Sequence, residues 1–517
     1  MFTCQQQMDE TYEKLSKNAI SSKFIATNVL VYTSTMLFGS GPYVFNDLCL
    51  GEISYKCEEP KNLFFKGNNT CMPYTLTNET GTLTESPGHC EKYSYSRGKV
   101  FKSSAISRYQ MICEDNYKIE VDLFVFLLGG FSAFFIISYF LDNYGRKPVT
   151  IASLIILILA QFSQIFIEVY PVFVLTRYIE GIITAGLCHS SFTACNEIVP
   201  SKFRNIGGVL VYGLFAVSVV LSACISWLTR EWLTFVAIEI FTNTIPLLGM
   251  IFLASESPRW LYLKKKDKFY EFINNANTNM GKKERIMKSS TQMSNISKKT
   301  KRSNIVDIFR YSSTRYNTII LVIISISSNL LYYGILFGSS LFHANVHLYL
   351  IFLGSFEAPM CLVYLLLSTF LNRKNLHFMS FIIGGVSCIL GSLLPKTGLW
   401  IFLVYFFAMF GKIASNFTQI NTYLWGSELF PTSHRAIGVG IFMGVGRMSI
   451  CILPGLRMLS AYHWPPLAAF LIGATALAVS FSHSVLQETK DMDLSETLEQ
   501  CEAKHQLAKI SDVQQDC

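Results

Sequence analysis

Long runs of apolar residues alternate with short polar segments along the 517 residues of this chain. Each run has about 20 residues, which at 1.5 Å per residue in an α-helix is enough to cross roughly 30 Å of hydrocarbon. The pattern predicts about twelve spans: residues 22–46, 119–141, 148–167, 171–192, 205–228 and 232–254, then 316–338, 345–371, 376–395, 399–423, 436–457 and 464–485. We therefore expect an all-α membrane protein.

Charged motifs repeat across the two groups of six spans. Glu197 and Arg204 recur as Glu428 and Arg435, and both are shifted by the same 231 positions (428 − 197 and 435 − 204). The motifs come directly after long apolar runs, so the duplicated unit is a membrane half of about six helices. Parallel halves of this kind are typical of one large class of secondary transporters.

The polar segments divide the chain and orient it. The loops after even-numbered spans collect Lys and Arg, as in Arg146-Lys147, which marks them as cytoplasmic. We expect these parts: a cytoplasmic N-terminus over 1–21 without a cleavable signal, a six-helix half over 22–254, a cytoplasmic linker over 255–315, a second half over 316–485 and a cytoplasmic tail over 486–517.

Composition agrees with a multi-pass membrane protein, with 51% hydrophobic and 15% charged residues. The formal net charge of +8 is then a topology signal, and no nucleic-acid partner is expected.

The loop over residues 47–118 has the features of an extracellular segment, which indicates the plasma membrane. It carries five disulfide candidates and two glycosylation sequons: Cys49, Cys57, Cys71, Cys90 and Cys113, with Asn68 and Asn78. Five is an odd number, so one thiol is left over or pairs elsewhere, and the connectivity stays open.

Residues of both charges gather at the predicted cytoplasmic helix ends. They are Asp142, Arg146, Lys147, Glu197, Arg204, Glu256, Arg259, Glu428 and Arg435. Partly shielded ion pairs among them would hold a cytoplasmic gate shut in one state and break in another, each contributing about 1 to 3 kcal/mol. The alternative is that these residues only fix the topology.

Several segments together resemble one transporter family. They are the turn from Asp142 to Lys147, the segment 256–261, Tyr332-Tyr333-Gly334, Gly411-Lys412, the segment 428–432 with Arg435, and the segment 486–490. In order and spacing they are similar to the organic cation, organic anion and carnitine transporters, which form solute carrier family 22 of the major facilitator superfamily. The resemblance implies a rocking twelve-helix carrier of small organic ions. The chain departs from the family pattern at Ser138, where glycine is usual, at Asn143, where arginine is usual, and over 372–375, which lacks the acid and the glycine.

Few charges lie inside the predicted spans, where each is costly unless it pairs or faces water. Arg447 resembles the pattern of the anion and carnitine branches, with Glu357 as its counter-charge, while Lys412 matches a family lysine that binds substrate or neutralises Glu357. This set favours an anion or a zwitterion, and a purely structural salt bridge is the alternative. Arg177 and Glu180 are expected to form a local pair, because they are three residues apart on one helix.

Aromatic residues would supply the rest of a cavity by stacking and cation–π contact. The candidates are Tyr332, Tyr333, Phe337, Tyr212, Tyr423 and Trp425.

Enzymatic motifs find no support in the sequence. It has no phosphate-binding loop and no zinc-spaced Cys/His cluster, so neither a cofactor nor a metal is expected. The prediction is a secondary-active or facilitative transporter whose partners are a small organic ion and the lipid bilayer. An organic cation transporter and a non-transporting receptor or scaffold remain alternative functions. A homo-oligomer is a possible assembly.

Overall fold

The computed structural model describes residues 22–489, apart from 51–53, 58–62, 66–72, 79–82, 88–92, 97–101, 200–203, 280–304, 339–344, 396–397, 431–434 and 483–485, together with residue 502. The described chain is mostly helical, as the apolar runs require, because a helix satisfies every backbone polar group within the segment.

The helices of the first half follow the predicted spans closely. Their bounds are α2 Ser22–Gly39, α3 Gly41–Cys49, α5 Tyr117–Tyr144, α6 Arg146–Phe166, α7 Tyr170–Ile198, α8 Arg204–Thr229 and α9 Trp232–Phe252. The first predicted span is divided into α2 and α3 at Ser40, directly before Gly41 and Pro42.

The second half repeats this order of helices. Its long helices are α13 Ser312–Leu336, α14 Val346–Phe370, α15 Arg373–Leu393, α16 Trp400–Leu429, α17 Arg435–Ser449, α18 Leu453–Tyr462 and α19 Leu467–Ser480. A short 3-10 turn, η3 Ile450–Ile452, joins α17 to α18 in front of Pro454.

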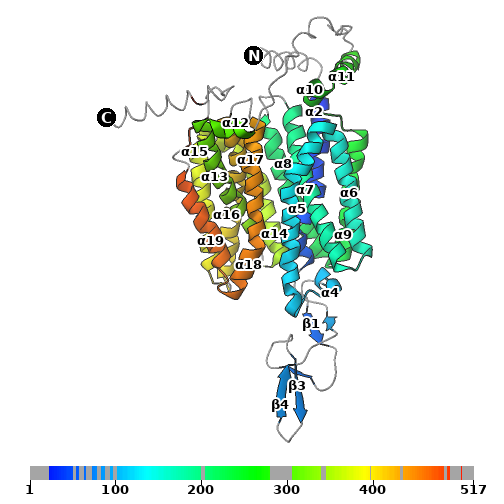
Figure 1. The fold of residues 1–517 in the computed structure, drawn as a ribbon, viewed down its shortest axis with the longest axis vertical. Helices are drawn as coiled ribbons and strands as arrows, with labels where there is room; N and C mark the ends of the chain where they lie inside the picture. Colours follow the sequence, from blue (N-terminus) through cyan, green and yellow to red (C-terminus); the bar gives the residue numbers. More distant parts are fainter. Residues whose placement is uncertain are drawn as a thin grey trace, which may run out of the picture.

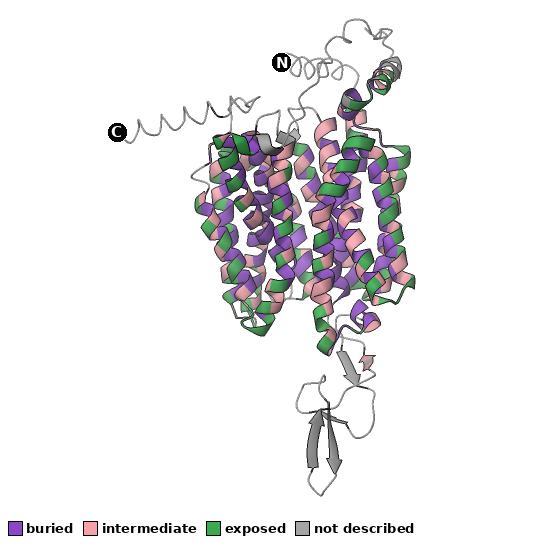
Figure 2. Cartoon of the chain, in the orientation of Figure 1, coloured by how far each residue is buried: buried purple, intermediate pink, exposed green. Residues whose placement is uncertain are grey.

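Helices of the two halves lie side by side, as Figure 1 shows: α8 packs against α14, and α5 packs against α17 and α18. The green, exposed positions in Figure 2 lie mainly on the outside of the bundle and the purple, buried positions inside it. Such an outer face suits contact with lipid, since lipid chains solvate apolar side chains well.

The ends of the bundle differ. At one end, which we call the β side, the chain forms short antiparallel strands: β1 Ser54–Cys57 pairs with β5 Tyr93–Ser96, and β3 Pro73–Asn78 lies between β2 Leu63–Phe65 and β4 Leu83–Pro87. The same side carries α4 Ala105–Tyr109 and the 3-10 turn η1 Cys113–Asn116. The opposite end, which we call the linker side, carries α10 Pro258–Lys264, α11 Lys266–Asn279 and α12 Ile305–Arg310 (Figure 1).

Ten helices of the described chain are long and apolar enough to cross a membrane. The divided first span and the shorter apolar α19 occupy the first and last of the twelve predicted positions. An all-α membrane bundle of two six-helix halves is therefore confirmed.

The prediction that Cys49 joins a disulfide is wrong. Helix α3 extends through Cys49, whose thiol is free and fully buried. The apolar run is interrupted by Asn46 and Asp47, which predicts a loop from residue 47, but both side chains are buried in the bundle and the helix continues past them. Cys113 is disulfide-bonded. The side chains of Cys57 and Asn78, and the whole of Cys71, Cys90 and Asn68, lie outside the described residues.

Candidate substrate site and helix-end ion pairs

Arg447 of α17 lies where the two halves meet. Its guanidinium Nη1 donates to the hydroxyl of Tyr333 in α13. The guanidinium carbon lies 5.0 Å from the centre of the Tyr333 ring and 5.9 Å from that of Phe134 in α5, which belongs to the other half. Arg447 forms no ion pair with any carboxylate of the described residues. It is therefore a cation held by aromatic rings rather than by an acid.

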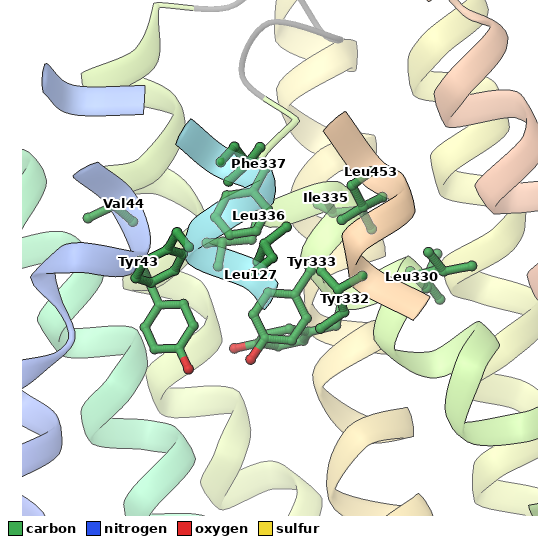
Figure 3. Packing of buried hydrophobic residues seen from close by; sticks show 14 of the residues in the cluster. Tyr43, Val44, Leu127, Leu330, Tyr332, Tyr333, Ile335, Leu336, Phe337 and Leu453 are labelled. Carbon is green, nitrogen blue, oxygen red and sulfur yellow. The ribbon is translucent and has the colours of Figure 1, made fainter. Parts of the chain in front are cut away.

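Further aromatic side chains extend this cluster across the interface. The ring of Tyr43 in α3 lies 6.1 Å from that of Tyr333, and Phe215 in α8 lies 6.5 Å from Tyr332. Tyr332 and Tyr333 meet edge to face at 5.1 Å. In Figure 3 the hydroxyl ends of the three labelled tyrosines point to the same side of the cluster. These residues build a cage of flat rings with polar tips next to Arg447.

A second charged group lies within the second half. Lys412 Nζ of α16 is 3.6 Å from Glu357 Oε2 of α14, and both side chains are almost completely buried. Glu357 Oε1 also accepts a hydrogen bond from the Tyr332 hydroxyl at 2.9 Å and one from the Asn416 amide. Lys412 Nζ makes no hydrogen bond and lies 3.0 Å from the centre of the Tyr332 ring. Lys412 therefore lies where it neutralises Glu357, which is one of the two roles predicted for it.

The ion pairs decide the charge of the site. Glu357 faces Lys412, so it is not the counter-charge of Arg447, and the predicted alternative of a mutual Arg447–Glu357 bridge is not found. Lys412 and Glu357 cancel, which leaves the positive charge of Arg447 without a carboxylate partner among the residues that the structure describes. A buried charge is stabilised when it meets an opposite charge, so this site is suited to an anionic group.

The remaining aromatic candidates occupy different places. Phe337 packs on Tyr333 with ring centres 5.9 Å apart, and Tyr212 of α8 packs against the buried cluster that contains Cys361 and Phe417. Tyr423 contacts Phe192 of α7 nearer the linker side.

Trp425 is different, because it is buried inside the second half. Its indole N–H donates to the Gln487 carbonyl, so it anchors the chain after α19.

The first half carries a hydrogen-bonded cluster at its linker side. The Arg146 guanidinium binds Glu197 through two hydrogen bonds, of 2.7 and 3.1 Å, and it also binds the Leu141 carbonyl and Asp142. Gly145 precedes this arginine with φ +114°, and a Cβ there would lie 2.3 Å from the Glu256 carboxylate. Glycine is therefore required at the turn.

Glu256 caps the start of α6 in this cluster. Its carboxylate accepts hydrogen bonds from the backbone N–H groups of Arg146, Lys147 and Ser257. Burial raises the pKa of the Glu256 carboxyl above its ordinary value, and these N–H groups oppose the rise. Lys147 Nζ donates to the carbonyls of Ile251 and Ala254 at the end of α9.

The second half repeats the arrangement with different residues. The backbone N–H groups of Arg373 and Lys374 donate to Glu488, and the Arg373 guanidinium reaches Glu428 at 3.4 Å. Two other nitrogens of this guanidinium, Nε and Nη1, are buried without an acceptor, and Glu428 is shared with the Thr489 hydroxyl at 2.6 Å. The segment 372–375 thus keeps the arginine, but its guanidinium lacks the additional hydrogen-bond acceptors that Arg146 has in the first half.

These ion pairs connect helices of one half only. The described linker-side pairs are Arg146 with Asp142 and Glu197 in the first half, and Arg373 with Glu428 in the second. Arg259 lies in the first turn of α10, while the side chains of Arg204 and Arg435 lie outside the described residues.

Three residues of the site were missed in the sequence. Tyr43 and Phe134 are ordinary aromatic residues of their spans, and only the packing of the halves brings them to Arg447. Asn416 is a polar residue within the predicted span 399–423; a buried amide within a span must find a partner, and here it is Glu357.

Known proteins similar to this chain are membrane transporters. Residues 77–497 match the family model described as sugar (and other) transporter. Solute carrier family 22 member 3 of Mus musculus is 25% identical over 77% of this chain and 72% of that protein. The organic cation transporter protein of Drosophila melanogaster is 25% identical over 85% of this chain and 82% of that protein.

The fold is similar to that of a solved transporter. The partially occluded inward open conformation of the xylose transporter XylE from E. coli has a TM-score of 0.64 at 15% sequence identity and covers 92% of this chain and 100% of that chain. The resemblance carried by the motifs and the expected major facilitator fold are both confirmed. The chain therefore belongs to the sugar (and other) transporter family and is a transporter rather than an enzyme.

Proposed function

We propose that this protein moves small organic anions or zwitterions across a membrane by alternating access, as a secondary-active or facilitative carrier. The observation that carries the proposal is the unpaired cation Arg447 at the interface of the halves, between Tyr333 and Phe134. A substrate carboxylate would neutralise the charge of Arg447, and the same rings would contact the organic part of the substrate.

The surrounding groups favour a flat or compact substrate. Tyr43, Tyr332 and Tyr333 offer hydroxyl groups beside ring faces, so an acid with one polar end and one apolar end fits both. A zwitterion would also need an acceptor for its cationic end. Glu357 could serve only if it exchanged Lys412 for the substrate ammonium group, since its carboxylate already holds that lysine and Asn416.

We give the linker-side ion pairs a different role in the rocking of the two halves from that of the predicted cytoplasmic gate. Because each described pair on the linker side joins helices of one half, it would not break when the halves rock. We assign them the role of bracing each half so that it moves as one body, with contacts between halves deciding which side is open.

The proposed location of the protein rests on the β side. The disulfide-bonded Cys113 is next to the strands of that side, which suits an oxidising compartment. The proposed orientation puts the β side outside the plasma membrane, with glycans at Asn68 and Asn78, and the linker side with both termini in the cytoplasm.

An organic cation carrier is the second candidate. One relative is named an organic cation transporter protein, and a cage of aromatic rings also suits a cation. Arg447 opposes a cation in the same cage, which places this candidate second. A non-transporting receptor or scaffold does not need a charged residue between the two halves, which places it third.

Radiotracer uptake separates these candidates. Cells expressing the chain, and control cells, should be given matched panels of organic anions, zwitterions and cations. Saturable uptake of anions or zwitterions is expected. Uptake of cations alone would establish the second candidate, and no uptake of any panel member by protein at the cell surface would favour the receptor or scaffold.

A further inference from the structure

His189 is a half-buried histidine of α7 next to the proposed substrate site. The centre of its imidazole ring lies 5.7 Å from that of the Phe134 ring. The Arg447 guanidinium approaches the same ring from the second half, with its carbon 5.9 Å from the ring centre. His189 and Arg447 therefore share one aromatic neighbour, and they cannot be further apart than these two distances together.

The position of His189 on α7 directs it toward the second half. Phe192 lies three residues further along α7, on the same face of the helix, and its ring meets that of Tyr423 in α16 across the interface. Since α7 ends on the linker side, His189 lies deeper in the bundle than this contact. His189 is thus a polar group of the first half that faces the space between the halves, and Arg447 faces the same space from the second half.

Helix α17 leaves room for a ligand in this region. Gly444 and Gly440 lie three and seven residues before Arg447, on the same face of α17 and toward the linker side. A Cβ at either glycine would have no neighbour within 4 Å beyond the backbone of α17 itself. The side chains of Arg447, Phe134 and His189 are partly exposed, although all three belong to the middle of long helices. These three side chains therefore border open space between the halves.

The imidazole of His189 has hydrogen-bonding groups to offer. Among the residues that the structure describes, His189 has no hydrogen-bond partner. Two other histidines of the long helices are engaged: His377 lies 2.8 Å from the Thr422 hydroxyl, and His347 lies 3.1 Å from that of Ser226. A neutral imidazole carries one N–H donor and one acceptor nitrogen. His189 thus keeps both for water or for a ligand.

The need for a partner grows when the halves close on a substrate. Closure displaces water from the space beside Phe134, and a polar group that loses its water without gaining another partner is destabilising. A substrate that binds Arg447 and ends in an apolar group leaves His189 in that state. A substrate that reaches past Phe134 with a polar atom satisfies the imidazole. The pair of Arg447 and His189 therefore favours acids that are polar at both ends.

We propose that His189 is a specificity-determining residue of this carrier, an inference that rests on the proposed function and names its substrate class. The substrates are organic acids with three parts. One carboxylate binds Arg447, an apolar middle part lies against Phe134, and an oxygen at the far end accepts a hydrogen bond from an imidazole N–H of His189. A hydroxyl group or a second carboxylate supplies this oxygen. Such a substrate bridges the two halves, because His189 belongs to the first half and Arg447 to the second.

Three acids of equal chain length test this role: hexanoate, ω-hydroxyhexanoate and adipate differ only at the end remote from the first carboxylate. Their affinities are measured by titrating purified protein and following its thermal stabilisation. The wild type should bind the two doubly polar acids about tenfold more tightly than hexanoate, which is the gain from one hydrogen bond in a site without water. A gain for adipate alone would assign the site to a second carboxylate, and a gain for both acids to an oxygen acceptor of either kind.

Variants of His189 separate recognition from packing. His189→Phe keeps a ring against Phe134 and should bind all three acids with the affinity that the wild type has for hexanoate. His189→Gln keeps an N–H donor and should retain part of the preference. His463→Phe, at an exposed histidine directly after α18, is the control and should retain all of it. If His189→Phe does not fold, His189→Leu takes its place.

The same titrations decide against the role of His189 in three cases. Equal wild-type affinities for the three acids, the absence of binding included, would overturn it. So would a preference that persists in His189→Phe, or an equal loss of affinity for all three acids in that variant, because a residue that only supports the packing would give that result.

Radiotracer uptake of the anion, zwitterion and cation panels tests the proposed function separately. Anion uptake by a wild type that binds the three acids equally would leave the transport proposal standing and remove the role of His189. A preference that depends on His189, in protein that takes up no member of any panel, would keep the binding site and overturn the transport proposal.

Discussion

Phe192 and Tyr423 occupy equivalent positions in the two halves, 231 residues apart (423 − 192), and they meet each other across the interface. Their ring centres lie 4.3 Å apart with the planes at 76°, an edge-to-face contact between α7 and α16. The described ion pairs on the linker side join helices within one half. This aromatic contact therefore holds the halves together where those ion pairs do not.

Shortening Phe192 should open the linker side. An edge-to-face pair contributes about 0.5 to 1.5 kcal/mol, so Phe192→Ala should shift the equilibrium between closed and open states by roughly two- to tenfold. Hydrogen–deuterium exchange of the linker-side ends of α7 and α16 should become faster. Tyr423→Phe keeps the ring and is the control. If exchange in Tyr423→Phe were as fast as in Phe192→Ala, the Tyr423 hydroxyl, rather than the ring contact, would hold the halves together.

The two helix-end arginines should differ in their effect on stability. Arg146→Met leaves Glu197 without its bidentate partner and should cost about 3 kcal/mol. Arg373→Met removes one 3.4 Å contact together with two buried nitrogens that lack acceptors, and it should cost about 1 kcal/mol or less. Thermal unfolding of the purified variants measures this order. Equal losses would show that the two clusters are energetically alike despite their geometry.

The sequence predicted the spans and the repeat well, because hydropathy and spacing are local properties of the chain. It also predicted the pair Arg177–Glu180, whose partners are one helical turn apart. It did not predict that Asp122, 55 positions earlier, binds the same arginine. Contacts of this kind depend on how helices pack.

The choice of partner for Glu357 shows the same limit. A single acid and two cations in three different spans allow more than one pairing, and charge alone favoured Arg447. The packing of α14 against α16 settles the pairing in favour of Lys412.

The glycine at the turn before α6 should not tolerate a side chain. At Gly145 both the backbone conformation, with φ +114°, and the nearby Glu256 carboxylate exclude a Cβ. Gly145→Ala should therefore lose several-fold in folded protein at the cell surface, because backbone strain of about 1 to 3 kcal/mol adds to the clash. Gly398→Ala is the matched control, with φ +62° and nothing within 4 Å of the Cβ, and its loss should be smaller. The reverse order would contradict the role given to Glu256.

Breaking the buried pair Lys412–Glu357 should reduce folded protein more than removing it altogether. Lys412→Met leaves an uncompensated carboxylate, which typically costs about 3 to 5 kcal/mol. The double variant Lys412→Met/Glu357→Gln should recover part of the loss. Size-exclusion chromatography of the extracted variants measures the folded fraction. A double variant that is worse than the single variant would show that the two residues are not each other's main partners.

The charge preference of the carrier is the central claim, and uptake by Arg447 variants tests it most directly. Initial rates of matched anionic, zwitterionic and cationic tracers should be compared for wild type, Arg447→Lys and Arg447→Gln at equal surface abundance. Arg447→Gln should lower anion and zwitterion uptake by at least tenfold and leave cation uptake unchanged. Arg447→Lys should keep part of the anion uptake, because it keeps the positive charge but lacks the planar set of N–H donors of a guanidinium. Anion uptake by Arg447→Gln equal to that of the wild type would contradict the account.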